Sequence, residues 1–180
     1  MLMPARLPFG STGRAPVTGD PPAEHRTGWL IAVELDTDSL ATSRSFIEYE
    51  RATAIRDLIA ENVFLPSGRT GGAFRLRLSI LDGKLVLDIS DEDANPIVRH
   101  VLSLSPLRRV IKDYFLICDS YYAAVRHAGP SQIEAIDMGR RGVHNEGSTI
   151  LCERLAGKIA LDFETARRLF TLVCALAWKG

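Results

Sequence analysis

Residues 74–90, FRLRLSILDGKLVLDIS, decide the fold class of this chain. Apolar residues occupy alternate positions on both sides of Asp82-Gly83, which is the pattern of strands with one buried face. Asp-Gly is the preferred pair for a two-residue type I′ turn. The stretch therefore predicts a β-hairpin, and the alternation in residues 97–104, after the turn-forming DEDANP of residues 91–96, predicts a third strand.

Upstream of the hairpin, the sequence predicts one strand and one helix. Residues 30–35 alternate with branched side chains and predict a first strand. Ser45 and Glu48 have the spacing of a capping box, and apolar residues then recur at helical spacing. We therefore expect a helix over residues 46–61 and a flexible connector, SGRTGG, over residues 67–72.

Downstream of the hairpin, the hydrophobic period changes to three and four residues. Pro106 fits the first position of a helix that Gly129 would cap at its carboxyl end. Ser131-x-x-Glu134 is a second capping box, and Asp162 fits the cap of a last, buried helix that is apolar nearly all round. The expected fold is α+β: a small antiparallel meander of three to four strands against four to five helices, concentrated in the carboxyl-terminal half.

Composition excludes several classes of protein. The chain has 180 residues, and 22 Lys and Arg balance 22 Asp and Glu, so no global field draws it to nucleic acid or to an anionic membrane. Its three scattered cysteines favour reduced thiols in a cytoplasmic protein, and no apolar run is long enough to span a bilayer. Residues 1–27 hold five of the nine prolines and predict a disordered tail before a single domain over residues 28–180.

The segment 130–148, PSQIEAIDMGRRGVHNEGS, is where functional chemistry is expected. In a continuous helix, Arg140 would fall inside the apolar stripe, with Asp137 and His144 on its shoulder. A core-facing arginine is costly unless a carboxylate, a carbonyl or an anionic ligand satisfies it. Three glycines, at 139, 142 and 147, each cost about 1 kcal/mol in a helix interior, so a break near residues 139–145 and a straight helix both remain open.

Two interpretations of this segment compete. In the structural one, Arg140 forms a buried ion pair with Asp137 or Glu134, next to a core histidine. In the functional one, Arg140 and Arg141 clamp a phosphate or carboxylate while His144 acts as general acid or base, oriented by Glu146. The remaining candidate ligand-binding residues are Asp137 and Asn145 in the same segment, and Arg108, Arg109 and Lys112 in a basic helical turn that otherwise forms a solvated face.

Three strings carry a family resemblance: PSQIEAIDMGRRGVHNEGS, LSLSPLRRVIKDYFLICDSYYAAVRHA and TARRLFTLVCALAW. With IEYERATAIRDLIAENVF upstream, they make residues 29–180 resemble uncharacterised protein family 0262, a family of small bacterial proteins. Ala177 departs from the family pattern, which has a histidine there, and this weakens any catalytic role for the position. The resemblance implies a bacterial, cytoplasmic setting and brings no activity, substrate, cofactor or catalytic residue with it.

Three functions are therefore open. We favour a non-catalytic binding or regulatory protein with a small anionic ligand or a protein partner, because no complete catalytic constellation can be assembled. The first alternative is a hydrolase or nuclease acting on a phosphate ester or phosphodiester through His144, and the second is a structural partner protein. The four histidines lack metal-ligand spacing, so neither a metal nor a cofactor is expected. Apolar helix surface leaves homodimerisation open.

Overall fold

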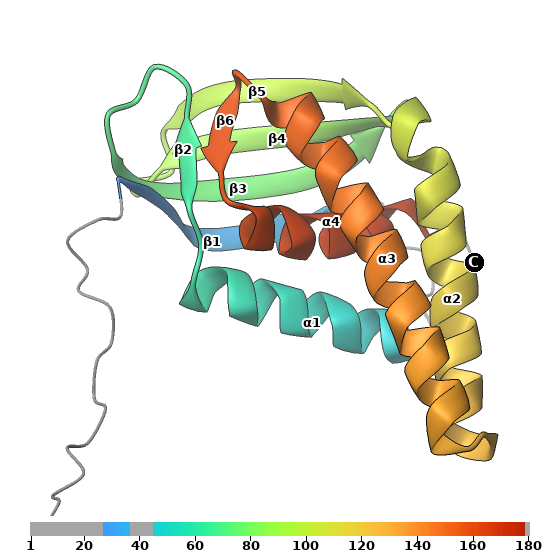
Figure 1. Cartoon of the computed structure of the whole chain (residues 1–180). Coiled ribbons are helices and arrows are strands. Elements are labelled where there is room, and N and C mark those ends of the chain that lie inside the picture. Colours follow the sequence, from blue (N-terminus) through green and yellow to red (C-terminus); the bar gives the residue numbers. More distant parts are fainter. Residues whose placement is uncertain (1–26, 37–44, 179–180) are drawn as a thin grey trace, which may run out of the picture.

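A computed structural model describes residues 27–36 and 45–178 (Figure 1). Along the chain it contains β1 (Gly28–Leu35), α1 (Ser45–Ala60), β2 (Phe64–Pro66), β3 (Gly72–Leu81), β4 (Lys84–Asp91), β5 (Pro96–Ser103), a short 3-10 helix (Ser105–Leu107), α2 (Arg108–His127), α3 (Pro130–Leu155), β6 (Ile159–Leu161) and α4 (Phe163–Ala177). The expected α+β fold is confirmed. The expected tail, residues 1–27, lies outside the described ranges except for Thr27.

The predicted hairpin forms the centre of a four-stranded sheet with the order β1-β3-β4-β5. Strands β3 and β4 pair antiparallel from Phe74↔Asp91 to Leu81↔Lys84, and β5 continues the meander. Both turn residues have positive φ, 51° at Asp82 and 70° at Gly83, as a type I′ turn requires. The hydrophobic alternation and the Asp-Gly pair were therefore sufficient to predict this part of the fold.

Strand β1 departs from the expected antiparallel arrangement. It runs parallel to β3, with Gly28 opposite Gly72 and Leu35 opposite Leu78, so the sheet is mixed. A parallel pair needs a long crossover connection, and α1 provides it. Two strands too short to show alternation, β2 and β6, form a separate antiparallel ladder and were not predicted.

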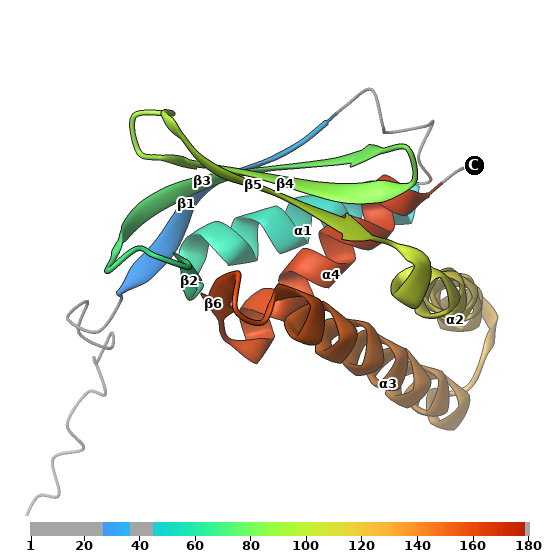
Figure 2. The same ribbon diagram turned by 90° about the horizontal axis from the view of Figure 1, so that it is seen from above.

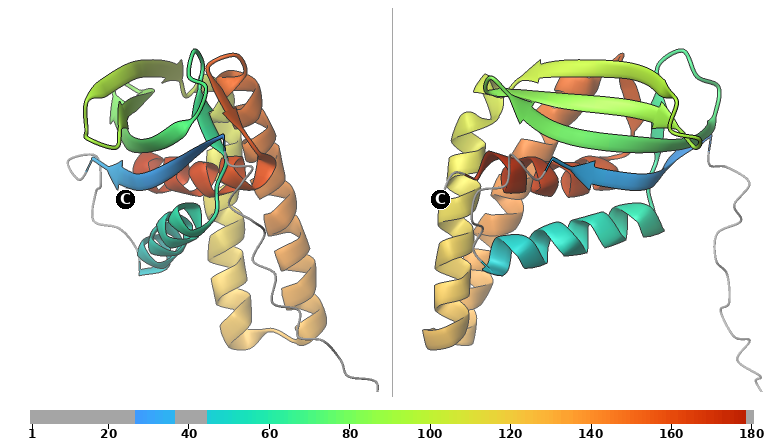
Figure 3. Two further views of the ribbon diagram at one scale, coloured as in Figure 1. Left: turned by 90° about the vertical axis from the view of Figure 1, so that its left-hand side faces the viewer. Right: turned by 180° about the vertical axis from the view of Figure 1, so that it is seen from behind.

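Helices cover one face of the sheet. Figure 2 shows α1 and α4 beneath the strands, and Figure 3 shows α2 and α3 as an antiparallel hairpin that extends beyond the sheet. Helix α4 lies in the middle and is buried almost all round, from Thr165 to Leu176, as its sequence predicts. Asp162 caps it as expected, with its carboxylate accepting from the Thr165 amide at 2.8 Å. The core is continuous from the inner face of the sheet to the four helices.

Three predicted features of the helix ends differ from the structure. Gly129 does not end α2 in a left-handed cap; Ala128 is the carboxyl cap, and Gly129 is the extended amino cap of α3 with φ −75°. Pro130 then occupies the first turn, which makes the proposed Ser131 capping box redundant, because Ser131 is already inside the helix. Pro106 lies in the 3-10 helix that precedes α2, so α2 begins at Arg108, two residues later than expected.

Candidate functional site

Helix α3 is continuous from Pro130 to Leu155, so the straight-helix alternative holds. The close packing of α3 against α4 explains why a glycine is accepted at position 147. A Cβ placed there would lie 2.2 Å from Cζ of Phe170, a fully buried residue of α4. The absence of a side chain lets α3 and α4 approach closely, and the burial obtained offsets the helix-propensity cost of the glycine. Gly142, in contrast, faces open space.

Arg140 is held by carboxylates from two helices. Its Nε and Nη2 lie 3.2 and 3.0 Å from Oδ1 of Asp137 in the previous turn, and its Nη1 lies 3.7 Å from Oε1 of Glu50 in α1. The guanidinium also stacks 4.8 Å from the centroid of the Tyr121 ring. The predicted pair with Asp137 therefore forms. Yet 27% of the Arg140 side chain is exposed, so this is an ion network at a surface opening and not in a closed core.

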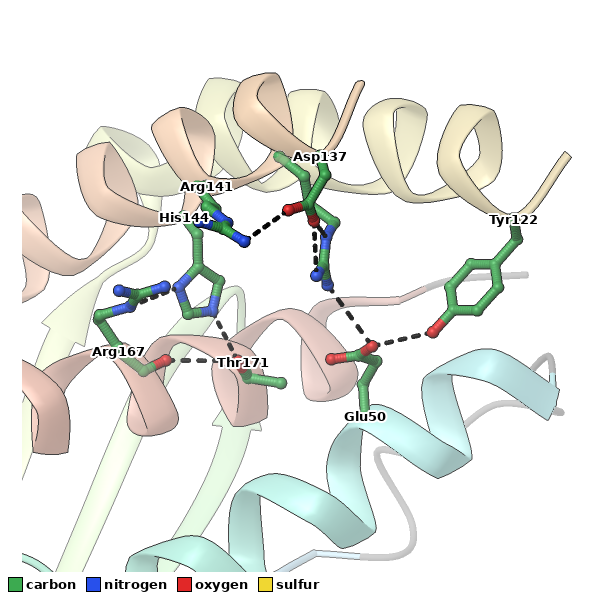
Figure 4. Close-up of polar contacts among 8 residues, drawn as sticks. Glu50, Tyr122, Asp137, Arg141, His144, Arg167 and Thr171 are labelled. Carbon is green, nitrogen blue, oxygen red and sulfur yellow. Dashed lines mark hydrogen bonds and ion pairs between the residues drawn. The ribbon is translucent and has the colours of Figure 1, made fainter. Parts of the chain in front are cut away.

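Asp137 also holds Arg141, whose Nη2 lies 2.9 Å from the second carboxylate oxygen. The hydrogen bond from Arg140, followed by the charges of both arginines, lowers the pKa of Asp137 below its usual value. The Arg141 side chain is 71% exposed, so its single contact is readily exchanged for another anion. On the far side of Arg140, Glu50 accepts a 2.9 Å hydrogen bond from the Tyr122 hydroxyl (Figure 4).

His144 has both ring nitrogens engaged by α4. Nε of Arg167 donates to Nδ1 at 3.2 Å, so this nitrogen is unprotonated and Nε2 carries the proton. Nε2 lies 2.8 Å from Oγ1 of Thr171, whose hydroxyl donates in turn to the Arg167 carbonyl at 3.3 Å. Burial, with the nearby charges of Arg167 and Arg140, lowers the pKa of His144 to about 4. The imidazole is thus neutral at pH 7 and fixed in one tautomer.

These groups border a single cavity of about 320 Å³, which we call the arginine pocket. Figure 4 shows its polar contacts between α1, α3 and α4. Helices α3 and α4 supply two guanidinium groups each, α1 supplies two carboxylates, and α4 supplies a third carboxylate, Glu164. The full lining is Glu50, Thr53, Ala54, Asp57, Tyr114, Arg140, Arg141, His144, Glu164, Arg167, Arg168 and Thr171. Such a lining suits a small polar ligand with at least one anionic group.

The structure brings together some of the predicted site residues and separates others. Asp137, Arg140, Arg141 and His144 lie on one side of α3 and form or flank the pocket. Asn145 and Glu146, which follow His144 in α3, are exposed and do not line the pocket. Glu146 is two residues from His144, a spacing at which helical side chains do not face each other. The expected imidazole–carboxylate pair is therefore not assembled.

The basic turn of α2 is separate from the arginine pocket. Arg108 and Lys112 line another cavity at the far end of the α2–α3 hairpin, with no lining residue in common. Arg109 is directed to Asp113, with Nε 3.6 Å from its carboxylate. These three candidate ligand-binding residues therefore lie apart from the cluster around Arg140.

Of the twelve residues that line the pocket, nine were not predicted from the sequence, among them Glu50, Arg167, Arg168 and Thr171. The two arginines carried a usable signal, since they are the cations of an otherwise apolar helix. Arg168 donates to the Glu61 carbonyl at 2.6 Å, which ties α4 to the end of α1. Glu50 carried no such signal, because a glutamate on an amphipathic helix ordinarily faces solvent.

The described part of the chain holds neither a metal-binding cluster nor a membrane-spanning helix. Across residues 27–36 and 45–178, no three His, Cys, Asp or Glu side chains lie close enough to hold a metal ion. No helix in that part of the chain has the length and hydrophobicity needed to cross a membrane.

Comparison with known proteins identifies close relatives. A protein of Bradyrhizobium sp. (strain ORS 278) is 57% identical over 165 residues, which cover 91% of this chain and 98% of the relative. A protein of Xanthobacter autotrophicus is 58% identical over 162 residues, covering 89% and 99%, and one of Agrobacterium fabrum is 60% identical over 151 residues, covering 84% and 96%. All three are described as UPF0262 proteins.

No solved structure matches the chain. The model of the uncharacterised protein family UPF0262 matches residues 27–179, nearly the whole segment that carried the resemblance in the sequence. The chain belongs to the uncharacterised protein family UPF0262.

Proposed function

We propose that this protein is a non-catalytic binding protein that holds a small anionic ligand in the arginine pocket. One observation carries the proposal: four arginines and a neutral imidazole border an open cavity of about 320 Å³. Arg141, with its exposed side chain and single carboxylate contact, is the group most easily redirected to a ligand. Arg167 uses its Nε for His144, and its Nη1 lies 3.7 Å from Oε1 of Glu164, an exposed carboxylate that an anionic ligand can displace.

The state of His144 supports binding over catalysis. A general base needs a free lone pair within reach of the proton that it removes, and a pKa near the working pH. The lone pair of Nδ1 faces the Arg167 guanidinium, and the pKa of His144 is depressed to about 4 by burial and two arginines. If the protein were instead a phosphoester hydrolase, it would hydrolyse phosphoesters, and His144→Ala would abolish this activity while the protein stayed folded. Activity retained in that variant would discard this alternative.

Thermal unfolding in the presence of simple anions tests the proposal. Inorganic phosphate and citrate are suitable probes, added from 0.1 to 50 mM at constant ionic strength set with sodium chloride. A ligand at 100 times its Kd stabilises by about 2.7 kcal/mol, which raises the Tm of a protein of this size by roughly 5–10 °C. Equal curves for every anion, with no shift beyond that of chloride, would refute an anion site.

Arg140→Met separates the two roles of Arg140. Its ion pairs are partly exposed, so the free energy of unfolding should change by about 1 kcal/mol or less, whereas anion affinity should fall about tenfold or more. Arg109→Met is the matched control, since Arg109 also pairs with a carboxylate but lies outside the pocket. A loss of several kcal/mol in Arg140→Met, with anion binding unchanged, would support a structural partner protein instead.

The cellular context is part of the same proposal. We propose a cytoplasmic location, supported by three cysteines that are all free thiols. A protein partner or a second copy of the chain remains compatible with the exposed apolar residues of the helical hairpin, Leu116, Val125 and Met138. Sedimentation at several concentrations would reveal a homodimer directly.

A further inference from the structure

A second cavity, of about 440 Å³, opens where α2 begins and α4 ends. Its walls are mainly apolar and come from the β3–β4 hairpin, the chain before α2, α2 itself and the last turn of α4. We call it the Trp178 pocket; its lining is Ile80, Gly83, Leu104, Arg108, Ile111, Lys112, Phe115, Ala177 and Trp178. It shares no residue with the arginine pocket.

The apolar part of this pocket is rigidly built. Leu104 and Ile111 are buried core residues, with 7% of each exposed. The Phe115 and Trp178 rings meet edge to face, with centroids 4.6 Å apart, and close one side. Aromatic pairs in this geometry stabilise each other beyond the area that they bury. The cavity is therefore a preformed apolar slot of a size that takes a small molecule.

The polar part consists of two cations. Arg108 and Lys112 are one helical turn apart on α2, so their side chains lie on the same side of the helix. Neither has a hydrogen-bond or ion-pair partner within residues 27–36 and 45–178, whereas Arg109 between them is directed to Asp113. No carboxylate is among the described residues that line this pocket. An apolar slot with two uncompensated cations is complementary to an apolar ligand with one anionic end.

We propose that the Trp178 pocket binds a free monocarboxylate with an alkyl or aryl tail. The tail occupies the slot against Phe115 and Trp178, and the carboxylate accepts from Arg108 and Lys112. The size of the cavity favours a small molecule over a protein segment, and this assignment is independent of the arginine pocket. A ligand of this kind gains affinity from both parts of the site, so each can be tested separately.

The fluorescence of Trp178 can report ligand binding in this pocket. The chain has two tryptophans, Trp29 and Trp178, so Trp29→Phe leaves a single fluorophore in the pocket wall. The Trp29→Phe protein is titrated with sodium octanoate below its micelle concentration, and with 1-octanol as the uncharged match. We expect saturable quenching or a spectral shift with octanoate, and at least tenfold weaker binding of octanol. From butyrate to octanoate, affinity should rise about fourfold per methylene.

Arg108→Gln/Lys112→Gln is the diagnostic variant. Both side chains are exposed, so the fold should survive, which a thermal unfolding curve verifies. Octanoate affinity should fall tenfold or more while octanol binding stays within twofold, and Arg140→Met should leave both unchanged. The proposal is overturned if octanoate does not saturate, if octanol binds equally well, or if the double variant binds octanoate as tightly as the parent. Tighter binding of a peptide ending in leucine than of octanoate would overturn the small-molecule assignment.

Discussion

Replacing glycines of α3 by alanine should have opposite effects at two positions five residues apart. Gly142 is exposed, and a Cβ there meets no atom within 4 Å. Alanine gains about 1 kcal/mol over glycine in a helix interior. Gly142→Ala should therefore raise the free energy of unfolding by about 1 kcal/mol and the Tm by roughly 2–4 °C.

Gly147→Ala gains the same helix propensity but meets the Phe170 ring. The added Cβ would lie 2.2, 2.3 and 2.6 Å from three ring carbons, far inside van der Waals contact. Phe170 is fully buried and touches the rings of Tyr114 and His144, so it cannot turn aside without moving them. Overpacking of this kind costs about 1–3 kcal/mol or more, which outweighs the propensity gain.

Urea unfolding at pH 7.5, monitored by circular dichroism, measures the change in free energy of unfolding in both variants. The comparison requires that their m-values are equal. The propensity gain is common to both variants and cancels, so the expected difference in free energy of unfolding is the overpacking cost, about 1–3 kcal/mol or more. Anion binding should weaken only in Gly147→Ala, because Phe170 supports His144 in the pocket wall. If Gly147→Ala is as stable as Gly142→Ala, the close approach of α3 and α4 at Phe170 is not what makes the glycine acceptable.

Three further predictions concern groups with defined partners. The pKa of His144 is about 4 in the folded protein and 6.5 in the exposed state. The free energy of unfolding should therefore be undiminished above pH 6.5 and fall by roughly 3 kcal/mol as the pH falls towards 4, because the unfolded chain takes up the proton first. NMR titration of the His144 ring protons should give the low pKa, and His144→Gln should flatten the pH dependence of unfolding. Asp162→Ala should cost about 1 kcal/mol in chemical unfolding by removing the cap of α4, and Asp162→Asn much less. Asn62→Leu should cost about 2–4 kcal/mol, because the buried Asn62 amide bonds the Leu30 amide and the carbonyls of Leu30 and Leu58; an unchanged urea midpoint would contradict this.

The parts of the fold that were predictable are those specified by neighbours in the sequence. The β3–β4 hairpin follows from alternation around Asp82-Gly83, and α4 follows from Asp162 and an apolar run. The connection from β1 to β3 contains α1, and the parallel pairing of the two strands depends on how this helix packs. No local sequence pattern reveals that packing. Continuity of α3 likewise depends on Phe170, 23 positions after Gly147 and in another helix.

The same distinction applies to the site. Arg140 was identifiable because an arginine interrupted an apolar stripe, and Asp137 was identifiable by its spacing of three residues. Glu50 and Arg167 complete the pocket from α1 and α4, and their approach to α3 is a result of tertiary packing. Sequence spacing identifies partners within one helix, and it gives no information about which faces of separate helices meet.

The energetics of the Arg140 network argue that stability alone does not account for it. Its members Asp137 and Glu50 have about a fifth of their side chains exposed, and Arg140 about a quarter. Pairs in this environment contribute about 0–1 kcal/mol, because water screens them and ordering long side chains costs entropy. A methionine could pack against Tyr121 at similar cost. An arrangement of charges that adds little to folding, yet borders an open cavity with three further arginines, is better explained by what it binds than by what it stabilises.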